Sequence, residues 1–173
     1  MKWMVAGAQG MLGTDLVERL LADNHTVIAV EKDELDITSG AAVEKMVNDV
    51  DVVANVAAYT AVDKAEEEES AAFTVNAVGP QHLARQCNKI GARLIHISTD
   101  YVFDGAATSP YPEDYPIDPA SAYGRTKAAG EWAVVSNTDN YLIVRTAWLY
   151  GAHGPCFPKT MARLSESLSL IHI

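Results

Sequence analysis

The sequence predicts an α/β fold in which helices cover both faces of a parallel sheet, the arrangement known as doubly wound. Short apolar runs alternate with longer helix-like segments along the 173 residues, as in successive strand–helix–strand units. A glycine-rich turn joins the first apolar run to the first helix-like segment, where such folds bind ligands. The length fits one domain that is large enough to bury a core.

The apolar runs are short, and several are rich in β-branched residues, as expected of strands. The segments that fit strands are residues 3–6, 26–30, 51–55, 93–98 and 141–145. Those between them that fit helices are about 12–23, 39–48, 71–90 and 123–135. Ser39 is expected to cap its helix, and Gly91 is a fitting C-terminal stop. Residues 106–122 contain four prolines without helical periodicity, which predicts an irregular surface loop.

Composition narrows the class of protein. The net charge of −10 argues against nucleic-acid binding, which needs a clustered basic surface. The acidic run Glu66–Glu69 fits a solvated helix face. Cys87 and Cys156 lack metal-ligand spacing and favour reduced thiols in a cytoplasmic protein. The N-terminal apolar run is too short for a signal peptide, and no segment approaches the roughly 20 apolar residues that span a bilayer.

The glycine turn fits a phosphate-binding loop. Gly7, Gly10 and Gly13 lie between the first strand and the first helix, where glycines permit a tight turn and close backbone approach to a pyrophosphate. The helix N-terminus adds free N–H groups. We therefore expect a Rossmann-like domain binding NADH or NADPH, a simple turn being the alternative. The residues predicted to bind cofactor here are Gly7, Gln9, Gly10, Met11, Leu12 and Gly13.

The residues after the second strand bear on the choice of cofactor. Glu31 could bind a ribose 2′-OH, which would favour NAD. Lys32 could instead meet a 2′-phosphate, so the sequence leaves NADH and NADPH both open. Asp36 and Ile37 are placed where a loop could flank the adenine, although a helix start also explains Asp36.

Tyr123 and Lys127 are the strongest catalytic candidates. Residues four apart share a helix face, and a neighbouring ammonium favours phenolate and lowers a phenol pKa. The alternative is a surface lysine beside a packed tyrosine. Ser98 and Thr99 follow the fourth strand, where a hydroxyl could polarise a substrate carbonyl or merely cap the strand end.

Several motifs in order resemble the extended short-chain dehydrogenase/reductase family. They are residues 7–13, 55–66, 96–105, 123–131 and 145–151. The resemblance implies NADH- or NADPH-dependent reduction of the C4 ketone of a dTDP-linked 4-keto-6-deoxy sugar. It also implies a homodimer with magnesium at a dimer contact, although the acidic ligands of that site cannot be matched to residues of this sequence.

The resemblance assigns roles to individual residues. Tyr123 would be the general acid that protonates the C4 oxygen and would also contact the cofactor, while Lys127 would hold the nicotinamide ribose and lower the Tyr123 pKa. Thr99, rather than Ser98, would be the third catalytic residue. Three residues after the third strand would line the cofactor, namely Ala57, Ala58 and Tyr59. Asn76 matches an asparagine near the cofactor cleft, with a structural role as the alternative.

Tyr101 and Trp148 match family positions that contact the deoxysugar, with core packing as the alternative for Trp148. Two other functions remain open. One is a nucleotide-sugar epimerase or dehydratase of the same family, since Asp100 adjoins the catalytic hydroxyl. The other is a non-catalytic subunit, like the reductase-like regulatory subunit of methionine adenosyltransferase.

The C-terminal end departs from the resemblance. Family members are considerably longer and close a C-terminal part over the sugar nucleotide, a part that we expect to be largely missing here. Residues 168–173 can be back-translated as CTGTCTCTTATACACATC, which matches a transposon end used in sequencing adapters. We therefore expect a cofactor-binding domain over 1–167 and a non-native tail over 168–173, which removes His172 as a candidate ligand.

Overall fold

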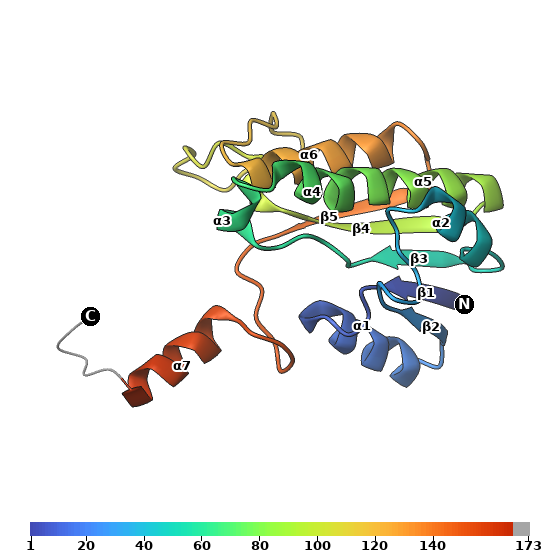
Figure 1. Ribbon diagram of the computed structural model, residues 1–173, viewed down its shortest axis with the longest axis horizontal. Coiled ribbons are helices and arrows are strands. Elements are labelled where there is room, and N and C mark those ends of the chain that lie inside the picture. The colour runs from blue at the N-terminus through green and yellow to red at the C-terminus, as the bar shows by residue number, and fades with distance from the viewer. Residues whose placement is uncertain (168–173) are drawn as a thin grey trace.

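A single parallel sheet organises the chain. In the computed structural model, which describes residues 1–167, five strands pair in the order β2-β1-β3-β4-β5 (Figure 1). Every neighbouring pair of these strands is parallel. The strands are β1 (Lys2–Ala6), β2 (Thr26–Val30), β3 (Val52–Asn55), β4 (Arg93–Thr99) and β5 (Tyr141–Thr146). The doubly wound prediction is confirmed, and the predicted tail at 168–173 lies outside the described residues.

Helices alternate with the strands along the chain. They are α1 (Met11–Ala22), α2 (Gly40–Met46), α3 (Val62–Ala65), α4 (Glu69–Phe73), α5 (Gly79–Ile90), α6 (Ala122–Val135) and α7 (Phe157–Ser167). A π-helical turn, η1 (Thr74–Val78), and a 3₁₀ turn, η2 (Asp100–Val102), complete them. Within residues 1–167, none of these helices combines the length and the apolar character that a bilayer-spanning helix requires.

The two faces of the sheet are covered unequally. Figure 1 shows α2, α5 and α6 over one face and α1 over the other, with α7 set apart from the sheet. The larger core lies under the three helices, where Met4, Leu83 and Leu94 are fully buried. A smaller core joins α1 to the sheet through Val5 and Leu20. Burial on both faces explains why the strands read as continuous apolar runs rather than alternating ones.

The residues that the sequence predicted to begin or end helices do so in the structure. The Ser39 hydroxyl accepts a hydrogen bond from the backbone N–H of Ala42 at 3.3 Å, which confirms the predicted cap of α2. Gly91 ends α5 in the left-handed conformation with φ of 74°, as predicted. The strand bounds differ from the predicted ones by no more than a residue.

The long helix predicted over 71–90 is wrong as a single α-helix, and α3 was not foreseen. Instead of one helix over 71–90, the chain forms α4, η1 and α5 in succession. Pro80 stands at the start of α5 and has no N–H to donate to the carbonyl of Asn76 four residues earlier, which disfavours a regular α-helical turn there. A π-helical turn accommodates the break, and such turns often occur at functional sites.

Helix α6 lies very close to this break. A Cβ added at Gly130 would come within 2.1 Å of the Asn76 carbonyl oxygen, so only glycine fits without backbone movement. The sheet also lies close to this glycine, because His96 Nε2 on β4 would be 3.4 Å from that Cβ.

Gly130→Ala therefore tests the packing of α6 against η1. Helix propensity alone would stabilise the protein by about 1 kcal/mol, whereas the clash with backbone should destabilise it by about 1–3 kcal/mol. Denaturant unfolding measures the sign. Ala129→Gly, one residue away on the same helix, reports the propensity of this stretch. A more stable Gly130→Ala protein would contradict the packing described here.

Candidate active site

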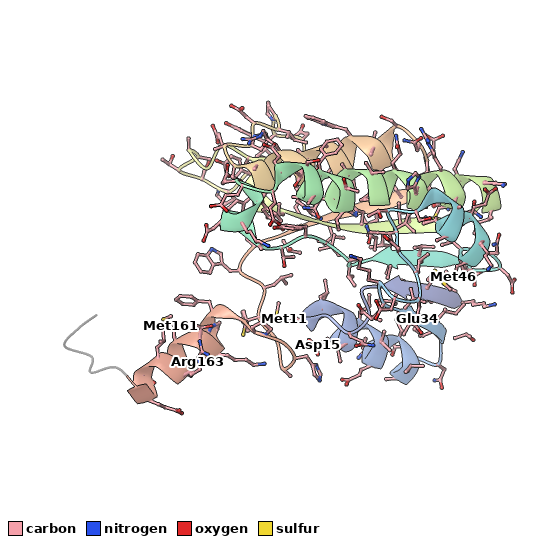
Figure 2. All side chains as sticks on the ribbon, viewed as in Figure 1. Met11, Asp15, Glu34, Met46, Met161 and Arg163 are labelled. Atoms are coloured by element: carbon pink, nitrogen blue, oxygen red, sulfur yellow. The ribbon has the colours of Figure 1, made fainter. Side chains whose placement is uncertain are left out.

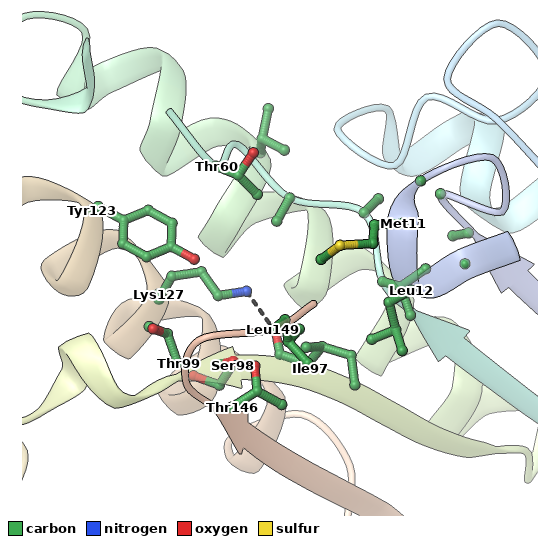
Figure 3. Close-up of a pocket in the computed structure, with 18 of the residues that line it drawn as sticks. Met11, Leu12, Thr60, Ile97, Ser98, Thr99, Tyr123, Lys127, Thr146 and Leu149 are labelled. Atoms are coloured by element: carbon green, nitrogen blue, oxygen red, sulfur yellow. Dashed lines mark hydrogen bonds between the residues drawn. The ribbon is translucent and has the colours of Figure 1, made fainter. Parts of the chain in front are cut away.

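A cleft of about 930 Å³ lies at the carboxyl ends of the strands. Each of the five strands contributes to its lining at or just beyond that end, through Ala6, Glu31, Val56, Thr99 and Thr146. Figure 3 shows the glycine-loop residues Met11 and Leu12 on one side of the cleft and Tyr123 and Lys127 on the other. The parallel sheet thus brings together the motifs that are far apart in sequence.

The glycine loop forms a close-packed backbone cradle. Gly7 has φ of 84°, and a Cβ there would lie 2.8 Å from the backbone nitrogen of Ala57. A Cβ at Gly13 would lie 2.1 Å from the Gly7 carbonyl oxygen. Gly10 precedes α1 without a side-chain cap, which leaves the first N–H groups of the helix free to meet an anion. These residues fit a dinucleotide phosphate group.

The residues beyond β2 form the adjoining wall. Glu31, Lys32, Asp36 and Ile37 all line the cleft. The Glu31 carboxylate accepts a hydrogen bond from the backbone N–H of Gln9 at 2.5 Å, which ties this wall to the glycine loop. Asp36 accepts hydrogen bonds from the hydroxyl and the backbone N–H of Thr38, and these bonds lower the pKa of its carboxyl.

Of the fifteen residues predicted to bind cofactor, all but Gln9, Tyr59 and Asn76 line the cleft. Asn76 is 1% exposed and contacts Tyr59 and Thr126 rather than the cleft. Its side chain accepts from the Tyr59 N–H at 2.8 Å and donates to the Tyr59 carbonyl and to the Thr126 hydroxyl, each at 3.1 Å. The Tyr59 hydroxyl donates to Glu68. The structural alternative for Asn76 is the one that these contacts favour.

The three predicted catalytic side chains converge in the cleft. Thr99, Tyr123 and Lys127 line it together, and Figure 3 shows them facing the same space. Lys127 is 2% exposed, and its Nζ donates to the carbonyl oxygen of Ile97 at 2.6 Å. Thr99 donates to Asp100 Oδ1 at 3.0 Å and accepts from the Tyr101 N–H at 3.2 Å. Ser98, buried beside them, also lines the cleft.

Burial dominates the electrostatics of the pair on α6. It raises the pKa of Tyr123, and Asp100 and Tyr101 add to the rise while a hydrogen bond with Thr99 opposes it. The net shift of the Tyr123 pKa is therefore upward, opposite to the direction that the neighbouring Lys127 alone would give. Burial also lowers the Lys127 pKa to about 8, against the opposing effect of Glu131. At neutral pH both groups carry a proton, as a proton donor must.

Two aromatic residues border the cleft near Tyr123. The Tyr101 ring meets the Tyr123 ring edge-on, with centroids 5.6 Å apart. Trp148 is 78% exposed, so the alternative that it packs in the core is wrong. Both residues also line an adjoining hollow of about 520 Å³. The two predicted sugar-contacting residues thus stand where the cleft and the hollow meet.

The segment between β5 and α7 borders the cleft and contacts α1. His153 Nδ1 lies 2.7 Å from Asp15 Oδ1, and Figure 2 shows Met11 and Asp15 on the part of α1 that faces this segment. Asp15, Glu18 and His153 bring ligand atoms within 4.8 Å of one another. All three are partly or fully exposed, so the group is a surface cluster that fixes the segment.

Part of the cleft lining was not predicted from the sequence. The further lining residues include Thr60, Thr74, Val75, Thr146, Ala147, Leu149 and Pro155. Thr146 ends β5, and Ala147 and Leu149 follow it, so the rule that ligands bind at the carboxyl ends of strands could have found them. Thr74 and Val75 belong to η1, which the prediction of one continuous helix over 71–90 did not include.

Comparison with known proteins identifies relatives. The family described as RmlD substrate binding domain matches residues 1–173. Among curated proteins, the chain is 51% identical over 166 residues to dTDP-4-dehydrorhamnose reductase of Streptomyces griseus, covering 94% of this chain and 55% of that protein. The reductase of the same name from Mycolicibacterium smegmatis is 48% identical, with 98% of this chain and 53% of that protein covered. The chain therefore spans about half the length of these relatives.

Solved structures show the same likeness. A dTDP-4-dehydrorhamnose reductase of Clostridium acetobutylicum superposes with a TM-score of 0.94 at 46% identity, covering 96% of this chain and 60% of that one. The enzyme of that name from Bacillus anthracis, solved in complex with NADP, gives a TM-score of 0.94 at 39% identity, covering 97% and 60%.

The buried lysine makes the stability depend on pH. Folding lowers the Lys127 pKa from 10.5 to about 8, so between these values the unfolded chain binds more protons and the free energy of unfolding rises with pH. Lys127→Met removes this effect. We expect the free energy of unfolding of Lys127→Met, taken relative to that of the wild type, to fall by up to about 3 kcal/mol between about pH 7 and about pH 10. The reason is that the wild type gains stability from the lysine over this range and the variant does not.

Denaturant unfolding across this range measures the difference. In this difference the contributions of groups present in both proteins cancel. Cys87, whose pKa burial raises to about 12, is one of them. Lys45→Met, on the exposed surface of α2, controls for the loss of one positive charge. A difference between Lys127→Met and the wild type that stays constant with pH would contradict the buried-ammonium assignment.

Proposed function

Because the chain belongs to the RmlD substrate binding domain family, we propose that it forms the cofactor-binding and proton-donating part of an NAD(P)H-dependent reductase. The proposed reaction converts dTDP-4-dehydro-L-rhamnose to dTDP-L-rhamnose. One observation carries the proposal: Thr99, Tyr123 and Lys127 meet in a cleft whose other end is the glycine cradle. The homodimer and the cytoplasmic location stay predictions.

The glycine cradle would hold the cofactor diphosphate. Its backbone N–H groups at the start of α1 are the anion-binding part, and the glycines at 7 and 13 leave no room for side chains that would block it. Glu31, Lys32 and Asp36 would surround the adenosine end because they line the cleft beside the cradle. This orientation directs the nicotinamide end toward Tyr123 and Lys127.

A bound nicotinamide would supply a hydride to the C4 carbon, and the carbonyl oxygen would then need a proton. Tyr123 is suited to donate it because burial holds its phenol in the protonated form. The Thr99 hydroxyl now donates to Asp100, and it would orient the carbonyl oxygen beside the phenol by turning that proton from Asp100 to the carbonyl oxygen. Lys127 would stabilise the resulting phenolate, since an ammonium next to a developing negative charge lowers the barrier in a site of low dielectric.

Asp100 bears on the dehydratase alternative. Its carboxylate accepts the Thr99 hydroxyl hydrogen bond at 3.0 Å, so it supports that hydroxyl. Free acid/base carboxylates are what a dehydratase would need beside the cleft. This engagement favours the reductase among the functions considered.

Tyr123→Phe tests the proton donor. Removing the phenol hydroxyl should lower turnover of dTDP-4-dehydro-L-rhamnose by about 10²–10⁴-fold, while NADPH binding persists because the cradle is untouched. NADPH oxidation measures turnover, and fluorescence titration measures binding. Tyr141→Phe, at the far end of β5, is the matched control. Wild-type turnover by Tyr123→Phe would reject the mechanism, whereas a wild-type chain that binds NADPH without oxidising it would favour the non-catalytic alternative.

Glu31→Gln tests the preference between NADH and NADPH. Glutamine keeps an oxygen for the Gln9 N–H but removes the charge that opposes a 2′-phosphate, so the NADPH-to-NADH affinity ratio should rise by about tenfold. Lys32→Ala should lower that ratio. Calorimetric titration with each cofactor measures it, and Glu34→Gln on the same turn controls for charge loss outside the cleft lining. Equal affinity changes for both cofactors would remove Glu31 from this role.

A further inference from the structure

A two-pronged ion pair joins β5 to α6 beside the hollow. Arg145 Nε and Nη2 donate to Glu131 Oε1 and Oε2 at 2.9 and 2.8 Å. The Glu131 side chain is 3% exposed and that of Arg145 is 23% exposed. Buried ion pairs add little net stability compared with apolar packing, since both charges must leave water. The pair is therefore better explained by the other segments that its arginine contacts.

Arg145 uses the rest of its guanidinium on the loop between η2 and α6. Its Nη1 donates to the backbone carbonyl of Glu113 at 2.9 Å. Its Cζ lies 4.9 Å above the centre of the Phe103 ring, within the range of a cation–π contact. One side chain thus contacts this loop at two points ten residues apart in sequence.

The loop is built from aromatic rings rather than from regular structure. We name residues 103–119 the aromatic loop. Phe103 stacks on Tyr111 with centroids 4.3 Å apart and planes 5° from parallel. Tyr115 meets both rings edge-on, at 5.9 and 4.9 Å. Phe103 is at once the base of this stack and the ring beneath Arg145, so the position of Arg145 fixes the position of the stack.

The aromatic loop forms one wall of the 520 Å³ hollow. Phe103, Asp104 and Gly105 line it together with Trp148. Asp104 is itself held by the Tyr111 hydroxyl at 2.7 Å. The hollow shares Asp100, Tyr101 and Trp148 with the cofactor cleft, so a molecule in the hollow can reach the Tyr123 side of the cleft.

We propose that Arg145, oriented by Glu131, is a positioning residue that holds the aromatic loop in place where it lines the sugar-nucleotide site. The proposal rests on the proposed function, because it assigns the hollow to the sugar nucleotide. Arginine alone can make these contacts together: a planar fork to a carboxylate, a further N–H to a carbonyl, and a stacked face on a ring. Loss of the two hydrogen bonds from Arg145 to Glu131 should loosen the aromatic loop without disturbing the glycine cradle at the other end of the cleft.

Arg145→Lys tests this assignment in the full chain because it keeps the charge beside Glu131 while losing the fork and the stacked plane. Calorimetry should show affinity for dTDP-4-dehydro-L-rhamnose reduced by roughly tenfold, the equivalent of one charged hydrogen bond. NADPH affinity should stay within about twofold. Hydrogen exchange should be about tenfold faster at Tyr115 and Asp118, whose amides are bonded to Pro112 and Val102.

Phe103→Leu is the second variant. It leaves the ion pair intact and removes the ring, so it should loosen the same loop and weaken sugar-nucleotide binding even where Arg145→Lys fails to fold. Arg19→Lys is the control, because it alters an exposed arginine–carboxylate pair on α1.

Unchanged sugar-nucleotide affinity in both variants would overturn the proposal, as would equal losses of sugar-nucleotide and NADPH affinity. A wild-type chain that binds NADPH but not the sugar nucleotide would instead reject the proposed substrate. The exchange measurement separates these failures, since unaltered loop amides in both variants show that Arg145 does not hold the loop, whatever the ligand.

Discussion

The close approach of α6 to the backbone around it is the constraint on which the rest of the site depends. A Cβ at Gly124 would come within 2.2 Å of the Tyr101 carbonyl oxygen, and one at Gly130 within 2.1 Å of that of Asn76. Between these contacts the Thr126 hydroxyl accepts from Asn76. The helix is thus seated at both ends of the stretch that carries Tyr123 and Lys127, which leaves these side chains little freedom of position.

That seating sets the electrostatics of the site. Tyr123, Lys127 and Glu131 recur every four residues, so they lie along one face of α6. Because the helix sits so close, Lys127 and Glu131 are almost fully buried. Burial lowers the pKa of the Lys127 ammonium while Glu131 opposes the change. Arg145 in turn balances the Glu131 carboxylate. Tyr123, Lys127, Glu131 and Arg145 therefore belong to one connected row of ionisable groups.

The sequence predicted the parts of this arrangement that depend on local chemistry. The strand runs, the Ser39 cap, the Gly91 stop and the glycine cradle each follow from residues within one turn of one another. The direction of the Tyr123 pKa did not follow, because it is set by burial under distant segments. The pairing of Glu131 with Arg145 joins a helix to the next strand through a crossover, and no periodicity marks it. The π-helical turn required both Pro80 and the close approach of Gly130, which lie fifty residues apart in the numbering.

The exposed Trp148 shows how the segment after β5 completes the site. Its φ of 54° is unfavourable for a bulky residue, and such strain costs about 1–3 kcal/mol unless neighbouring contacts enforce it. Those contacts follow at once: Gly151 lies against Asp15, Gly154 lies against Met11, and His153 pairs with Asp15. With the segment fixed on α1, the strained backbone displays the indole between the cleft and the hollow. The strained backbone at Trp148 therefore holds the indole at the border between the cleft and the hollow.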